Sequence, residues 1–119
     1  MNVNDLYNMQ ASLNRVVAIE LEPKVSYRIS KILKKVVAEL KDAEDERQKL
    51  FKQFALPDDE GKKRVPEDKI EAFTAAWQVI LDEEVELGIQ KCPISLLEGI
   101  KLTAREMMDL EPIIDTEDL

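Results

Sequence analysis

The sequence predicts a mainly α-helical protein: a long antiparallel helical hairpin with a short N-terminal helix, a small extended segment and a short C-terminal helix. Ala, Glu, Lys, Leu and Arg make up 55 of the 119 residues, a composition typical of long helices. Apolar residues recur at intervals of three and four along most of the chain. The stretch from Pro23 to Phe54 contains neither glycine nor an internal proline.

The length fits one domain with a modest core. We therefore expect a single domain over residues 1–119. It divides into an N-terminal helix (1–22), the helical hairpin (23–84), a short extended segment (85–102) and a C-terminal helix with an acidic tail (103–119).

The first helix begins at a capping asparagine, Asn2 or Asn4, and ends near Ile19. Its apolar stripe consists of Leu6, Met9, Leu13, Val16 and Val17. Pro23 suits the first turn of the long second helix and disfavours helical geometry in the residue before it. The apolar face of the second helix consists of Ile29, Leu33, Val36, Val37, Leu40, Ala43, Leu50, Phe51 and Phe54.

A polar turn over residues 56–64 should reverse the chain. A third helix follows from Val65-Pro66 and ends around Glu83 or Glu84. Its apolar stripe consists of Ile70, Phe73, Trp77, Ile80 and Leu81, and we expect Phe73 and Trp77 in the core. The second and third helices then form the hairpin.

The period changes to two after the hairpin. Val85, Leu87 and Ile89 alternate with polar residues or glycine, which predicts a short strand. Residues 94–97 fit either an extended piece or one helical turn. Thr103 and Glu106 have the spacing of a capping box, so a last helix should run to Leu110 before Pro112. Residues 115–119 should form a frayed acidic tail.

Composition excludes several kinds of chemistry. The chain has no histidine and one cysteine, so it cannot assemble the usual zinc ligands or a histidine-activated nucleophile. No glycine-rich nucleotide loop is present, and the acidic clusters lack the spacing of an EF-hand. We therefore expect no catalytic residue, no metal and no cofactor, and a protein that is not an enzyme.

The charge is unevenly distributed. The net charge is −8, which argues against non-specific nucleic-acid binding. Residues 1–64 carry 13 basic and 11 acidic groups, a net +2, whereas residues 65–119 carry 4 and 14, a net −10. This distribution fits either ordinary solubility or self-association in which basic and acidic regions meet.

No secretory or membrane segment is visible in the sequence. The longest apolar run near the N-terminus, Val16–Ile19, is too short for a signal peptide or a spanning helix. The lone Cys92 cannot close an internal disulfide, which suits a reducing compartment. We expect a cytoplasmic protein that does not enter the membrane.

A basic stripe is the strongest candidate site. Lys24, Arg28, Lys31 and Lys35 fall within about 60° of one another on the second helix. The stripe lies opposite the apolar face, and no acid occurs between residues 23 and 38. It could hold a phosphate, a nucleotide or an acidic partner, or be a solvated helix face.

Two further residues are candidates for binding. Tyr27 is exposed by its helical angle and could stack on a base or line a partner surface. Arg47 interrupts the apolar stripe. It either pairs with a local acid such as Glu44 or Glu46, or contacts a ligand or a second subunit.

Three runs of the sequence stand out together: Leu21–Ile29 at a helix start, Glu46–Phe51 near a helix end, and Leu81–Leu87 leading into a strand. In these runs the chain resembles a family of small uncharacterised proteins from tailed bacteriophages and prophages. The similarity covers roughly residues 20–90. It implies a phage-encoded accessory or assembly protein in the host cytoplasm and carries over no catalytic residue.

These observations lead to two expectations about function. The first is a non-enzymatic phage interaction or assembly protein that binds another phage or host protein. The alternative is a counter-defence protein that sequesters a nucleotide signal or blocks a host defence enzyme. Four apolar residues could be covered by another copy, so we also expect a homo-oligomer; they are Val16, Val25, Ile32 and Val79.

Overall fold

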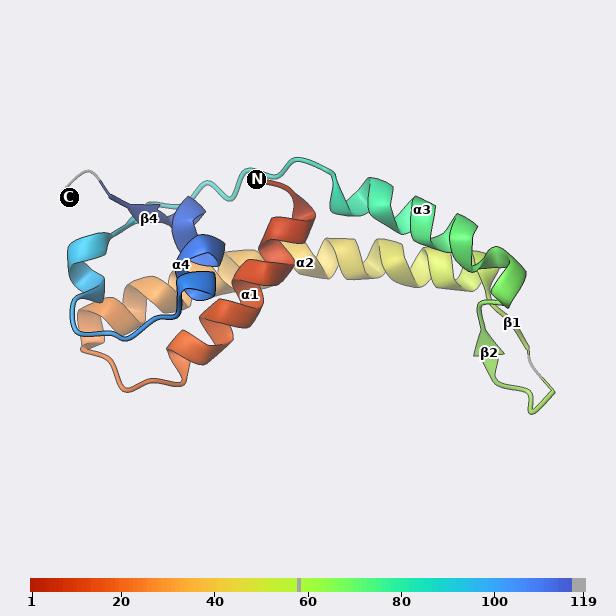
Figure 1. The fold of residues 1–119 in the computed structure, drawn as a ribbon, viewed down its shortest axis with the longest axis horizontal. Helices are drawn as coiled ribbons and strands as arrows, with labels where there is room; N and C mark the ends of the chain where they lie inside the picture. Colours follow the sequence, from red (N-terminus) through yellow and green to blue (C-terminus); the bar gives the residue numbers. More distant parts are fainter. Residues whose placement is uncertain (58, 117–119) are drawn as a thin grey trace.

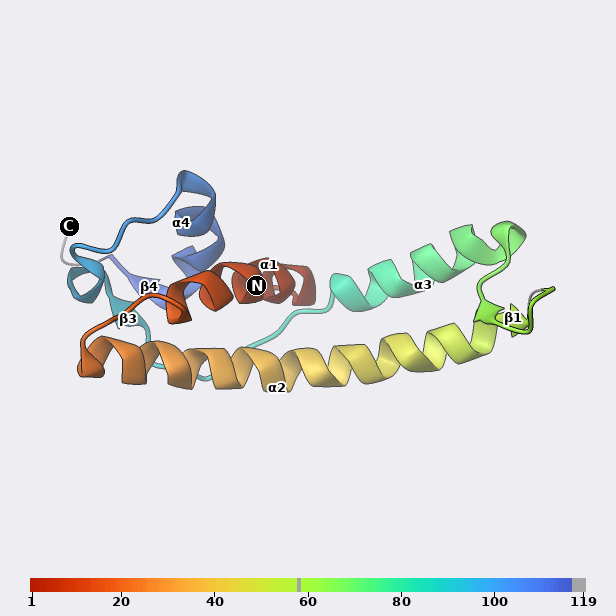
Figure 2. The ribbon, with the colours of Figure 1, turned by 90° about the horizontal axis from the view of Figure 1, so that it is seen from below.

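The computed structural model describes residues 1–57 and 59–116 and confirms the mainly α-helical fold class (Figure 1). The α-helices are α1 (Val3–Val17), α2 (Pro23–Phe54), α3 (Ile70–Leu81) and α4 (Ala104–Leu110). The 3₁₀ turns are η1 (Glu67–Lys69), η2 (Ile94–Leu97) and η3 (Glu111–Ile113). The molecule is elongated, 56 × 27 × 23 Å, and α2 runs along most of its length (Figure 2).

The helix starts follow the capping residues in the sequence. Asn2 caps α1, and its capping box closes through Asp5. Thr103 and Glu106 form the predicted capping box of α4. Pro23 occupies the first turn of α2, which has no side-chain cap. The predicted hairpin is present: α2 and α3 run antiparallel and are joined through a small antiparallel ribbon of β1 (Leu56–Pro57) and β2 (Lys63–Arg64).

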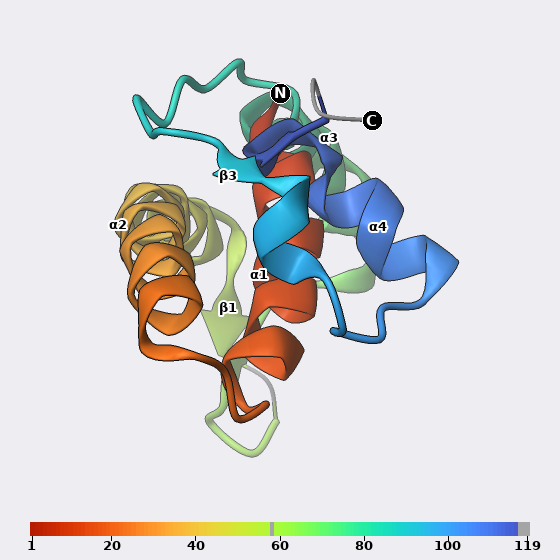
Figure 3. The ribbon, with the colours of Figure 1, turned by 90° about the vertical axis from the view of Figure 1, so that its left-hand side faces the viewer.

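The core lies at one end of the molecule. There α1 lies between α2 and α4 (Figure 3), and the segment that contains β3 (Cys92–Pro93) and β4 (Ile114–Asp115) closes over it. Leu6, Met9 and Leu13 of α1 are fully buried. The last buried residue of α2 is Ala43, and no residue of α3 is buried to that degree. The other end is thus a thin two-helix arm.

Half-buried aromatic rings hold this arm together. Phe54 and Phe73 meet edge to face with ring centroids 6.2 Å apart. Tyr7 of α1 meets Trp77 of α3 in the same way at 6.1 Å. The prediction that Phe73 and Trp77 lie in the core was therefore wrong in degree, because both side chains are only half-buried. Ile70 and Val37, also predicted on apolar faces, are 49% and 44% exposed.

The chain itself covers three of the four residues that we expected a second copy to cover. Val16, Val25 and Ile32 are buried in the core, and only Val79 is exposed. The physical reason is that residues 92–115 fold back over α1 and the first half of α2. These residues therefore give no support to the predicted oligomer.

The predicted strand at Val85–Ile89 does not form. Val85, Leu87 and Ile89 do point inward while their neighbours are exposed, but no strand lies beside them. The only pairing in this region of the described chain is an isolated bridge between Asn2 and Glu84. The strand lies further on, where β3 pairs in parallel with β4.

The bounds of the third helix and of the acidic tail also differ from prediction. The third helix begins at Ile70 after the turn η1 and ends at Leu81, earlier than expected. Residues 94–97 form the 3₁₀ turn η2, which decides between the two structures left open. Asp115 belongs to β4 and is not frayed, and residues 117–119 of the predicted tail lie outside the described residues.

Among the helices of the described chain, none combines the length and the apolar character needed to cross a membrane.

Candidate functional site: a basic groove along α2

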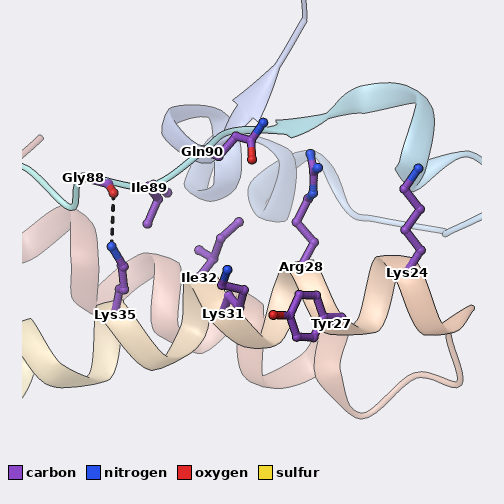
Figure 4. A pocket seen from close by; sticks show the side chains of 9 residues that line it. All are labelled: Lys24, Tyr27, Arg28, Lys31, Ile32, Lys35, Gly88, Ile89 and Gln90. Atoms are coloured by element: carbon purple, nitrogen blue, oxygen red, sulfur yellow. Dashed lines mark hydrogen bonds between the residues drawn. The ribbon is translucent and has the colours of Figure 1, made fainter.

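The structure brings five of the six predicted binding residues into one groove of about 410 Å³ (Figure 4). The groove runs between the first half of α2 and the chain at residues 88–90. We call it the basic groove; it is lined by Lys24, Tyr27, Arg28, Lys31, Ile32, Lys35, Gly88, Ile89 and Gln90. The basic stripe therefore forms one wall of a concave surface. The positions of its residues on a single helix could not predict this concavity.

The spacing of the basic residues creates this wall. Steps of four, three and four residues put Lys24, Arg28, Lys31 and Lys35 on one line of a helix with 3.6 residues per turn. Lys35 fixes the opposite wall, because its Nζ donates a hydrogen bond to the Gly88 carbonyl oxygen at 3.1 Å. Gly88 has a φ of +60°, a conformation that glycine adopts without the steric cost of a Cβ atom.

The floor and one side of the groove are apolar. Ile32 is buried beneath the stripe, and Ile89 is half-buried in the opposite wall. Tyr27 is 67% exposed. The Lys31 Nζ lies 5.3 Å from the centroid of its ring, within the range of a cation–π contact. The groove thus offers a flat aromatic surface next to positive charge.

Electrostatics favours an anion in the groove. The described residues that line it include four cations and no acid. Lys24 lies in the first turn of α2, where the helix dipole already presents positive charge, and that turn contains no acidic residue. Because the position of Lys24 works against the helix, the stability of α2 does not explain it.

The neighbouring Cys92 is not a reactive thiol. It is fully buried, and burial raises the pKa of the thiol while the charge of Arg28 acts in the opposite direction. A protonated, inaccessible sulfur is a poor nucleophile. Cys92 therefore belongs to the core rather than to the groove.

Arg47 lies outside the basic groove. It is 12 residues beyond Lys35, about 18 Å along α2. Its Nη1 is 3.3 Å from the Glu44 Oε2, which confirms the predicted pairing with a local acid. Glu44 also accepts a 2.6 Å hydrogen bond from the Tyr7 hydroxyl. The structure thus gives Arg47 a partner within α2.

The sequence analysis missed the continuation of the basic groove. Beyond Lys35 the surface becomes a second groove of about 340 Å³, again between α2 and the chain that follows α3. We call it the acidic groove; its carboxylates are Glu39, Asp42, Glu46, Glu83, Glu84 and Glu86. Following the direction of the basic stripe further along α2 predicts the first three of these carboxylates. The position of residues 83–90 beside α2 depends on tertiary folding, and no local sequence pattern predicts it.

The acidic groove is only partly neutralised. The N-terminal ammonium lies 3.3 Å from Glu84, and Lys49 lies 2.9 Å from Glu46. Across residues 1–57 and 59–116, no three His, Cys, Asp or Glu side chains are grouped so that they could hold a metal ion.

Comparison of the chain with protein-family models, with curated proteins and with solved structures finds no match. The resemblance to bacteriophage proteins therefore stays a prediction.

Proposed function

We propose that this protein is a non-enzymatic interaction protein of a bacteriophage, and that the basic groove binds carboxylate or phosphate groups of its partner. The observation that carries the proposal is the lining of this groove, which among residues 1–57 and 59–116 provides four cations, an exposed tyrosine and no acid. Charged residues across an interface steer the encounter and fix the register of the two partners. One wall of the groove is the long helix α2. Lys35 joins this wall to the opposite one through its hydrogen bond to the Gly88 carbonyl oxygen.

A second candidate is sequestration of a nucleotide signal in the same groove. It is favoured by Tyr27 beside Lys31, which would place a stacking face next to phosphate-binding charge. The volume of about 410 Å³ also falls in the usual range for small-molecule sites. Against it, only Arg28 is an arginine, the residue that best matches phosphate geometry.

A thermal-shift panel tests both candidates. The probes are poly-L-glutamate, pyrophosphate, and cyclic and linear nucleotides. The variants are Arg28→Ala/Lys31→Ala and the control Lys41→Ala, which removes an exposed lysine of α2 that does not line the groove. A probe at a hundred times its Kd stabilises the folded state by about 2.7 kcal/mol, which is readily visible as a rise in Tm.

An interaction surface predicts stabilisation by poly-L-glutamate that is lost in Arg28→Ala/Lys31→Ala and kept in Lys41→Ala. A nucleotide-binding protein predicts stabilisation by one nucleotide well beyond that by pyrophosphate. If no probe raises Tm, or if the double variant responds like the wild type, both candidates are wrong. Genes for heads or tails beside this one would support assembly, and an early accessory cluster would support counter-defence. A bacterial housekeeping operon would contradict a phage origin.

A further inference from the structure

We propose that a second copy of this chain occupies the groove, in an antiparallel pair in which the acidic groove of one protomer lies on the basic groove of the other. The inference rests on the proposal that the basic groove is a contact surface, and it names the occupant. The residues that carry it lie on α2 and form what we call the charged line: Lys24, Arg28, Lys31, Lys35, Glu39, Asp42 and Glu46.

The charged line is one continuous surface. At 100° per residue, all seven residues fall within about 40° of the direction of Lys35. Arg28 is partly exposed and the other six are exposed. The two grooves follow one another between α2 and the chain that follows α3, the basic groove beside residues 88–90 and the acidic groove beside residues 83–86. The sign of the charge changes once, between Lys35 and Glu39.

The spacing is nearly symmetric about Val37. Lys35 and Glu39 lie two residues before and after it, and Arg28 and Glu46 lie nine before and after it. Lys31 lies six residues before Val37 and Asp42 five residues after it. A two-fold axis that crosses α2 at this level therefore sets Arg28, Lys31 and Lys35 opposite acids of the other copy. Lys24 lies 13 residues before Val37, opposite Leu50, and gains no acid. Such a contact is isologous and closes as a dimer.

Most charges on this line have no opposite charge paired with them in the described part of their own chain. Within residues 1–57 and 59–116, the structure contains no ion pair for Lys24, Arg28, Lys31, Glu39 or Asp42. Lys35 bonds only to the Gly88 carbonyl oxygen, and Glu46 pairs with Lys49. These charges are therefore available to a partner.

The arrangement also works against the isolated helix. Lys24 and Arg28 are like charges four residues apart, as are Lys31 and Lys35, and Asp42 and Glu46. Like charges at this spacing destabilise a helix, and cations at its N-terminus oppose the dipole. A second copy would set opposite charges against both members of the Lys31–Lys35 and Asp42–Glu46 pairs. In the Lys24–Arg28 pair it would do so for Arg28 alone.

Charge reversal tests this pairing. In the basic-reversed variant, Arg28→Glu/Lys31→Glu, the whole line becomes mainly acidic. In the acid-reversed variant, Asp42→Lys/Glu46→Lys, it becomes mainly basic. Lys35 and Glu39 are left unchanged, so that the hydrogen bond to Gly88 is kept. The controls are Lys41→Glu and Glu71→Lys, which reverse exposed charges outside both grooves.

The readout is molar mass by light scattering and sedimentation. The wild type should reach about twice 13.7 kDa at low ionic strength. It should dissociate as salt rises from about 0.01 M to about 1 M, over which the Debye length falls from roughly 30 Å to 3 Å. Each reversed variant alone should raise the dimer Kd by about tenfold or more. An equimolar mixture of the two should dimerise again, as should the chain that carries all four substitutions.

The mixture guards against misfolded variants, since two chains that regain association must present intact surfaces. The pairing is overturned if the wild type is monomeric at low salt, if either reversed variant dimerises like the wild type, or if the controls dissociate equally. A monomeric wild type whose Tm still rises with poly-L-glutamate through Arg28 and Lys31 would overturn the pairing and leave the proposed function standing. A monomer that responds to no probe would overturn both.

Discussion

Arg15 of α1 and Glu106 of α4 form an ion pair that joins two helices 91 residues apart in the sequence. Arg15 also donates from Nη2 to the Lys101 carbonyl oxygen at 2.9 Å, so it spans the start of α4. One turn away, the Ser12 hydroxyl donates to Asp109 at 3.0 Å. The C-terminal segment is thus held to the N-terminal helix by polar bonds as well as by the core.

This ion pair predicts an acid-sensitive stability. The hydrogen bond from Arg15, followed by the Thr103 backbone N–H, lowers the pKa of Glu106 from 4.5 to about 2. Because the pKa is lower in the folded state, the stabilisation is complete above pH 4.5 and is lost as the pH falls toward 2. Glu106→Gln should therefore lower Tm at pH 7, and the difference from the wild type should shrink steadily toward pH 2. Equal differences at pH 7 and pH 2 would show that the charge of Glu106 contributes nothing.

The fully buried Leu13 tests the location of the core. Leu13→Ala should lower the free energy of unfolding by about 3 kcal/mol, because it leaves a cavity between packed helices. The matched control is Val17→Ala on the same helix, where the side chain is 40% exposed and the change should stay within about 0.5 kcal/mol. Urea denaturation measures both. Similar losses at the two positions would contradict the core described above.

Gly88 tests the opposite wall of the basic groove. With φ at +60°, an L-residue is strained there, although no atom lies within 4 Å of where a Cβ would be. Gly88→Ala should therefore cost about 1 kcal/mol of stability, and Gly88→Asn should cost less, because asparagine tolerates this conformation. Denaturation of the two variants separates backbone strain from a steric clash. A larger loss for asparagine than for alanine would indicate a clash instead.

Tyr7 tests how α1 is joined to the arm. Burial, and then the hydrogen bond to Glu44, raise the pKa of its phenol, while its ring packs edge-on against Trp77. Tyr7→Phe removes only the hydrogen bond and should cost about 1 kcal/mol with little change in Trp77 emission. Tyr7→Ala also removes the ring, so it should cost more and shift the emission to longer wavelength. A red shift already in Tyr7→Phe would contradict this division of roles.

The local rules predicted the helices well. Asn2 and Thr103 cap helices where their side-chain chemistry predicts it, and Pro23 lies in the first turn of α2 as its fixed φ predicts. The same rules predicted a strand at Val85–Ile89, because alternation reports which side chains point inward. It does not report whether another strand lies alongside, and here none does. The pairing of Cys92–Pro93 with Ile114–Asp115 joins short segments that have no distinctive pattern.

Only one wall of the candidate site could be predicted, because local patterns describe a single helix and not the segments that pack beside it. The angles of Lys24, Arg28, Lys31 and Lys35 follow from helical geometry alone. The return of the chain past Gly88, which turns a stripe into a groove, depends on long-range packing. Burial of Val16, Val25 and Ile32 also depends on that return, so their helical angles suggested a second copy that these residues do not need.

Cross-linking at the proposed two-fold axis tests the central claim, that α2 is the contact surface between two copies. Ala38 is exposed next to the axis, and the native Cys92 is buried, so Ala38→Cys would supply the accessible thiol. A short bismaleimide should join two Ala38→Cys chains at low salt and fail to do so at high salt. Lys52→Cys should not react in this way, because the two copies of residue 52 would lie about 45 Å apart in the antiparallel pair. Equal cross-linking at both positions, or none at Ala38→Cys, would contradict the account.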